Sequence, residues 1–111
     1  MPEISFWVQG SASDPYEVAF HKRSESNLSA SCSCPAGQNG QYCKHRFRIL
    51  EGNTKGIVSN NVADVEVVRS WLAGTDVEDA IAEMRALQEE ADRVKTALVA
   101  AKKKVARAMR D

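Results

Sequence analysis

The sequence predicts an α+β fold, in which a small β-meander with a short helix precedes one long C-terminal helix. Apolar and polar residues alternate with period two over residues 4–9 and again over 16–21, which is typical of half-buried strands. From residue 75 to 110 the chain holds neither glycine nor proline, and its apolar residues recur at spacings of three and four. That spacing is typical of a coiled-coil helix.

The strands of the first third are separated by turn residues. The stretch 10–15 (GSASDP) has turn composition and separates the first two strands. A polar link at 23–27 leads to a third, shorter strand at 28–32, in which Leu28, Ala30 and Cys32 share a face. Three short strands joined by short links are expected to form an antiparallel meander.

The middle of the chain is less regular. Residues 35–41 (PAGQNGQ) have the composition of a loop, and residues 44–51 read as a short helix that Gly52 ends. Residues 53–61 are expected to be a connector. Residues 62–72 are expected to form a helix, although Val-Glu-Val-Val within them would also suit a strand.

The long helix has a start signal and a continuous apolar seam. Thr75, followed three residues later by Glu78, resembles a capping box. The seam runs for more than four heptads, and it predicts a coiled coil. Its positions are Val77, Ala80, Met84, Leu87, Ala91, Val94, Leu98, Ala101, Val105 and Ala108. Since the chain has no second long helix to cover this seam, we expect a homodimer or a helical protein partner.

Charge along the long helix favours an antiparallel homodimer. Its first half is acidic, with Arg85 as the one basic residue before Arg93, and its second half is basic. A parallel pair would place like charges side by side along its whole length, whereas an antiparallel pair places each acidic half beside a basic half. The basic end also has a simpler interpretation, because cations near a helix C-terminus are favoured by the helix dipole.

Size and composition limit the function classes. With 111 residues, the chain can hold one small domain with an appendage, and its first half has few large core residues. No targeting segment is recognised, and no stretch approaches the roughly 18 apolar residues of a membrane span. Three cysteines within twelve residues cannot all pair as disulfides, which indicates a reducing, cytoplasmic setting.

These cysteines form the motif that carries chemistry. Cys32 and Cys34, then Cys43 and His45, offer three thiolates and one imidazole, a set that suits a structural zinc ion with no open position for a catalytic water. Residues i and i+2 of a strand point the same way, so Cys32 and Cys34 can converge. On a helix they lie about 200° apart, so Cys43 should precede the helix whose first turn contains His45.

With its CxC and CxH pairs, the string CSCPAGQNGQYCKH resembles the SWIM zinc finger over roughly residues 16–51. The resemblance implies one structural zinc on the same four ligands, and a role in binding nucleic acid or protein instead of catalysis. It does not extend to residues 57–111. We divide the chain into a SWIM-like zinc-binding segment at 1–56, a connector with a short helix at 57–74, and the heptad helix at 75–111.

Basic residues near the motif are candidates for nucleic-acid contacts. Lys44 and Arg48 share one stripe of the short helix with Glu51, and Lys22 and Arg23 could join them; the alternative is an ordinary solvated face. Arg46 falls on the apolar side, where it either donates to the zinc thiolates or extends past the helix end. Neither catalytic constellations nor cofactor-binding loops are recognised, so we expect no enzyme, no small-molecule substrate and no membrane association.

Two functions remain open at this point. The first is a non-enzymatic adaptor that binds DNA or RNA through the finger and assembles through the coiled coil. The second is a pure protein-interaction module, a regulator or inhibitor, in which the zinc is only structural. Salt dependence separates them, because phosphate contacts weaken steeply as salt rises.

Overall fold

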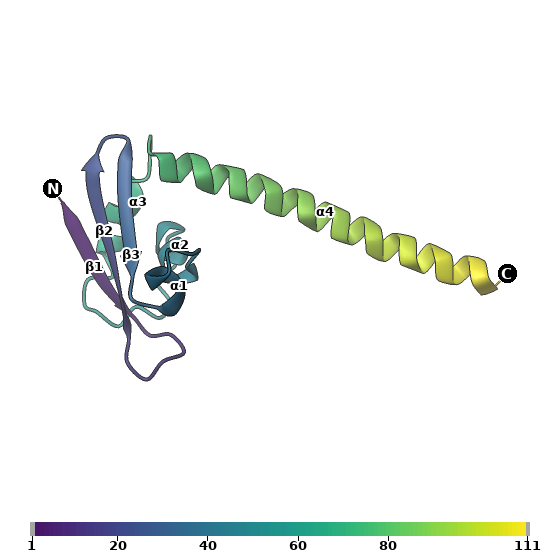
Figure 1. The fold of residues 1–111 in the computed structure, drawn as a ribbon, viewed down its shortest axis with the longest axis horizontal. Coiled ribbons are helices and arrows are strands. Elements are labelled where there is room, and N and C mark those ends of the chain that lie inside the picture. The colour runs from purple at the N-terminus through teal and green to yellow at the C-terminus, as the bar shows by residue number, and fades with distance from the viewer. Residues whose placement is uncertain (1, 111) are drawn as a thin grey trace. The chain divides into compact units, whose positions relative to one another are not determined.

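The structure is a computed structural model that describes residues 2–110, and its elements are drawn in Figure 1. The chain divides into two compact units, one extending to Glu78 and the other beginning at Asp79. We call residues 2–78 the head. Residues 57–74, which sequence composition separates from the zinc-binding segment, therefore belong to the same unit as that segment.

A three-stranded antiparallel sheet forms one layer of the head, and the predicted meander is confirmed (Figure 1). Phe6 lies opposite Val18, and Val18 lies opposite Cys32, so these three residues share one face of the sheet. Val18 and Phe20 are fully buried on that face, and the rings of Phe20 and Phe6 pack in a T-shaped arrangement with centroids 6.1 Å apart. The strands are β1 (Glu3–Val8), β2 (Tyr16–Ser24) and β3 (Asn27–Cys32).

Two short helices complete the core of the head. Helix α2 (Lys44–Leu50) contacts both β3 and helix α3 (Asp64–Ser70). Ile49 on α2 is 2% exposed, and Val65 and Val68 on α3 are almost completely buried. The helical interpretation of residues 62–72 is thereby confirmed, since the spacing of Val65 and Val68 places both side chains on the inner face of a helix.

The segment between α2 and α3 pairs with the edge strand of the sheet. Val8 and Ile57 form an isolated antiparallel bridge. The N–H of Gln9 donates to the carbonyl of Gly56, and the N–H of Val58 donates to the carbonyl of Trp7, both at 2.8 Å. The connector thus covers an edge that would otherwise present unpaired backbone groups.

The loop expected at residues 35–41 contains one turn of helix, α1 (Pro35–Gln38). Cys34 is its N-cap, and its Sγ atom accepts a hydrogen bond from the N–H of Gly37 at 3.3 Å. Pro35 occupies the first helical position, where its missing N–H costs nothing. Composition alone predicted a loop because proline, glycine and asparagine, which are typical turn residues, occur together in the segment.

Helix α4 (Asp76–Arg110) extends over 35 residues and has no buried residue. Thr75 Oγ1 accepts from the N–H of Glu78 at 3.3 Å, while a Glu78 carboxylate oxygen accepts from the N–H of Gly74 at 3.2 Å. In the expected capping box, the Glu78 side chain would accept from the N–H of Thr75, so the observed bond to Gly74 is shifted by one residue. Among residues 2–110, no helix is both long enough and apolar enough to cross a bilayer.

Candidate metal centre

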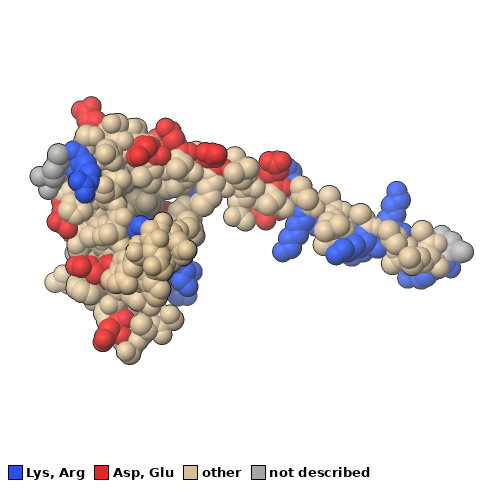
Figure 2. All heavy atoms as spheres, viewed as in Figure 1, with Lys and Arg blue, Asp and Glu red and all other residues tan. Residues whose placement is uncertain are grey.

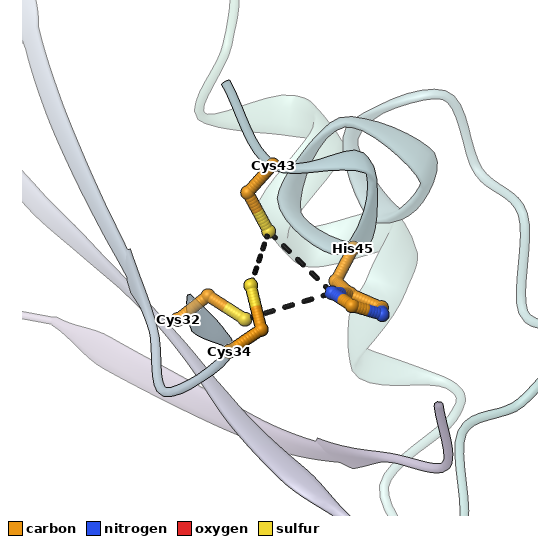
Figure 3. A group of neighbouring side chains, drawn as sticks. All are labelled: Cys32, Cys34, Cys43 and His45. Carbon is orange, nitrogen blue, oxygen red and sulfur yellow. Dashed lines mark hydrogen bonds between the residues drawn. The ribbon is translucent and has the colours of Figure 1, made fainter. Parts of the chain in front are cut away.

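The four predicted ligands come from four different places in the local structure and meet at one point (Figure 3). Cys32 ends β3, Cys34 caps α1, Cys43 caps α2, and His45 is the second residue of α2. Cys43 has extended backbone angles, φ −128° and ψ 118°, so it stands outside the helix. The prediction that only His45 of this pair lies within the helix is confirmed.

The distances among the ligand atoms suit tetrahedral zinc. The Sγ atoms of Cys34 and Cys43 lie 3.4 Å apart, and His45 Nδ1 lies 3.5 Å from Cys43 Sγ and 3.8 Å from Cys32 Sγ. Zinc–sulfur bonds of about 2.3 Å and zinc–nitrogen bonds of about 2.0 Å place such atoms roughly 3.5–3.8 Å apart. All four side chains are buried. The residues present therefore fit one structural zinc ion.

The ionisation of the thiols supports the same assignment. Burial raises the pKa of Cys32 to about 12, and the neighbouring Cys43 acts in the same direction. Burial also acts to raise the pKa of Cys43, but a backbone hydrogen bond from Arg46 and the adjacent Cys34 and His45 side chains outweigh it and lower the pKa to about 6. Cys43 thus ionises more readily than Cys32, and a bound cation would favour the thiolate form of both.

Two residues hold the loop that carries Cys34 and Cys43. A methyl group at Gly37 would overlap the backbone carbonyl of Cys32 and lie 2.9 Å from the Cys32 Cβ, so only glycine fits there. The guanidinium of Arg46 donates to the carbonyls of Ala30 at 3.1 Å and Gln41 at 2.7 Å. The Arg46 side chain therefore joins β3 to the loop before α2, while its backbone N–H, not its guanidinium, bonds to the thiol of Cys43.

His45 presents its second nitrogen away from the cysteines, as Figure 3 shows. The ring of Tyr16 lies against the imidazole, with centroids 5.1 Å apart. A Cβ atom at Gly10 would lie 2.6 Å from the Tyr16 ring and 3.2 Å from His45 Nε2. A side chain at Gly10 would thus crowd both the Tyr16 ring and the outer edge of His45.

A pocket of about 380 Å³ opens beside His45, and we call it the basic pocket. Lys44 and Arg48 line it from α2, Lys55 lines it from the connector, and Val8 and Gly10 form the facing wall. Its lining residues include no aspartate or glutamate. Of the expected stripe, Lys44 and Arg48 line this pocket, whereas Glu51 is not among its lining residues. Lys55 is not among the contacts predicted from the sequence, because its approach depends on the pairing of Gly56 with Gln9.

Lys22 and Arg23 lie elsewhere. Val18 pairs with Cys32, and Lys22 is four residues further along β2, roughly 13 Å at 3.3 Å per residue. Lys22 Nζ donates to the carbonyls of Glu25 at 3.2 Å and Trp71 at 2.8 Å. Arg23 Nε donates to Ser29 Oγ at 2.5 Å. The structure does not bring these two residues to the basic pocket.

Comparison with known proteins supports the metal assignment. The family model of the SWIM zinc finger matches residues 6–51. No curated protein and no solved structure matched the chain. The match begins ten residues earlier than the recognised resemblance, because it includes part of β1. Residues 6–51 of this protein are a SWIM zinc finger, with one structural zinc site formed by Cys32, Cys34, Cys43 and His45.

Proposed function

We propose that the protein is a non-enzymatic adaptor that binds nucleic acid through its zinc finger and assembles through α4. The basic pocket is the observation that carries the first half. Lys44, Arg48 and Lys55 reach it from two separate segments, and its lining lacks acidic side chains. Three cations around one concave site favour phosphate, and a chain of phosphates would extend beyond it.

The chemistry of the metal site supports a binding role. A zinc ion with four protein ligands has no free coordination position for a water or a substrate. Zinc would instead hold β3, α1 and α2 together and so fix Lys44 next to Arg48. SWIM fingers are typically binding modules. Because its three thiols must stay reduced to bind metal, the proposed adaptor acts in a reducing, cytoplasmic compartment.

The test uses charge reversal at two residues that are not ligands. Lys44→Glu together with Arg48→Glu should weaken binding to random-sequence DNA and RNA at least tenfold near 100 mM salt, and should reduce the salt slope by about two. Zinc content should remain one equivalent, and Lys22→Glu together with Arg23→Glu, at the end of β2 away from the zinc site, serves as a control of equal charge change. Unchanged binding by the double variant, or no binding by the wild type, would leave the pure protein-interaction function instead.

Assembly through α4 is supported by exposed apolar residues at seam positions. Leu87, Val94, Leu98 and Val105 are each more than half exposed. Acidic side chains gather along the first part of α4 and basic ones along its second part, as Figure 2 shows. An antiparallel pair of helices places Leu87 against Leu98 and Met84 against Ala101. It also sets acidic halves beside basic halves, which makes a second copy of this chain the proposed partner.

The direction of the pair can be tested by cross-linking. In the antiparallel register, Glu83 of one copy flanks Lys104 of the other. Mixing the variants Glu83→Cys and Lys104→Cys, both kept loaded with zinc, should give a disulfide between the two different chains. The variant Glu83→Cys alone should stay uncross-linked, since its two cysteines lie far apart. Ready cross-linking of that variant with itself would mean that the helices run parallel.

A further inference from the structure

We propose that the finger takes single-stranded nucleic acid, with a phosphate in the basic pocket and an unstacked base against Tyr42. This inference rests on the proposed function and names its substrate class. It starts from a second concavity, also about 380 Å³, which we call the aromatic pocket. Tyr16, Pro35, Ala36 and Tyr42 line it.

The two pockets are adjacent, because Ser11, Lys44 and His45 line both of them. One side of this shared boundary carries the cations and the other carries the aromatic rings. A nucleotide has the same division, with an anionic phosphate joined through the sugar to a flat base. The arrangement therefore matches one nucleotide unit of a chain better than it matches a free anion, which has no flat group to contact the aromatic side.

Tyr42 is placed as a stacking surface would be. Its side chain is 63% exposed although it directly precedes the buried ligand Cys43. Its ring lies 5.9 Å from the ring of Phe47, tilted by 50°. Phe47 therefore supports one side of the ring and leaves most of the tyrosine exposed to solvent. An exposed aromatic ring beside a basic groove is the combination on which proteins stack single-stranded bases.

His45 supplies a donor at the boundary of the two pockets. The side chain is 9% exposed, and its Nδ1 atom faces the three sulfurs. With Nδ1 bound to metal, Nε2 carries the ring hydrogen and can donate it. The hydrogen bonds found for His45 among residues 2–110 involve Nδ1, so Nε2 can donate to an acceptor on a ligand, such as a phosphate or base oxygen. Metal-bound histidines commonly donate in this way.

The aromatic pocket excludes paired bases as occupants. In a duplex each base is covered by its neighbours, and Tyr42 could reach only a base at an end or in an unpaired region. Phosphates alone would be equally available in both forms. Selectivity for single strands thus reports binding in the aromatic pocket. The salt-dependent affinity that both forms share reports phosphate binding in the basic pocket.

The experiment measures the affinity of the zinc-loaded protein for one fluorescent 12-mer, alone and annealed to its complement, at fixed salt. The single strand should bind roughly tenfold more tightly than the duplex, since stacking of one base contributes about this factor. Tyr42→Ala should lower single-strand affinity about tenfold, leave duplex affinity unchanged and leave the salt slope unchanged. Tyr42→Phe, the matched control, should retain wild-type affinity because it keeps the ring.

Lys55→Ala should act differently, lowering affinity for both forms and reducing the salt slope by about one. Tyr42→Leu preserves apolar packing against Phe47 and should behave as Tyr42→Ala does, so a folding defect of the alanine variant does not decide the result.

Equal binding of both forms, with Tyr42→Ala and Tyr42→Leu both neutral, would overturn this inference. If both forms bound equally but the double variant Lys44→Glu with Arg48→Glu abolished binding, the proposed function would stand although this inference had failed. No binding of either form would overturn both.

Discussion

The head and the long helix α4 are stabilised by different interactions. The head buries a small core around Phe6, Phe20 and Ile49 and gathers four buried ligand side chains at one point. Helix α4 has no buried residue in 35. Its order within one chain rests on local backbone bonds, helix-forming residues and an N-terminal cap, and its apolar seam is free to meet a surface outside the chain.

The difference shows where each region is vulnerable. A core of this size supplies little stability by itself, so we expect the head to depend on its metal site. Helix α4 contains no metal ligand, and its proposed stability comes from a second copy of the chain. A change that removes one support should therefore leave the other region intact, and this independence can be measured.

Zinc removal should have the largest effect. Chelation, or the substitution Cys43→Ser, should unfold the head, because a structural zinc contributes on the order of 10 kcal/mol to small domains of this kind. Amide signals of β1–β3 and α2 should lose their dispersion in NMR spectra. Circular dichroism at 222 nm should keep most of its intensity, because α4 remains helical. A head that stays dispersed in excess chelator would contradict the dependence on metal.

A charge in the seam should separate the proposed dimer and spare the head. Leu87→Asp removes two leucines from each antiparallel pair, which should weaken association by about 4 kcal/mol at 1.5–3 kcal/mol per buried leucine. Sedimentation should then report a monomer at concentrations where the wild type is dimeric. Zinc content should stay at one equivalent. Gln88→Asp, one position away from the seam, is the control and should stay dimeric.

The substitution Gly37→Ala should damage the metal site without touching a ligand. The added methyl group overlaps the Cys32 carbonyl, so the turn carrying Cys34 must move, at a cost of about 2 kcal/mol or more. Zinc affinity, measured by competition with a chelator, should fall at least tenfold. Gly40→Ala is the comparison, because nothing lies within 4 Å of the added group and only its φ of +69° is unfavourable. Equal effects of the two variants would contradict this account.

The smallest effect concerns Lys22, which sequence analysis placed among the nucleic-acid contacts. Lys22→Ala removes the hydrogen bonds to the Glu25 and Trp71 carbonyls and should lower the free energy of unfolding by about 1 kcal/mol. Affinity for nucleic acid should not change. Denaturant titration and binding at matched salt measure the two quantities. A loss of affinity like that expected for Lys55→Ala would instead mean that Lys22 contacts nucleic acid.

Much of the fold could be predicted because its signals are local. Period two determined the strands, and unbroken spacing of three and four determined α4. The helix at 62–72 stayed ambiguous because Val-Glu-Val-Val suits either structure, and contact between α3 and α2 decided it. Helix α1 was missed because it depends on Cys34 capping Gly37 and on glycine fitting against Cys32. These residues are neighbours in the sequence, but the fit depends on backbone conformation, which composition does not specify.

For the site, the sequence by itself determined the four ligands, since residue type and spacing limit which side chains can bind one zinc ion. It also determined that Cys43 must stand outside the helix, because helical geometry separates positions i and i+2. Only the tertiary structure decided which cations share a surface. Lys55 joins Lys44 and Arg48 because the connector pairs with β1, and Lys22 does not because β2 carries it away from the zinc. The net charge of a segment can be summed from its sequence, whereas the distance between two charged side chains depends on how distant segments pair.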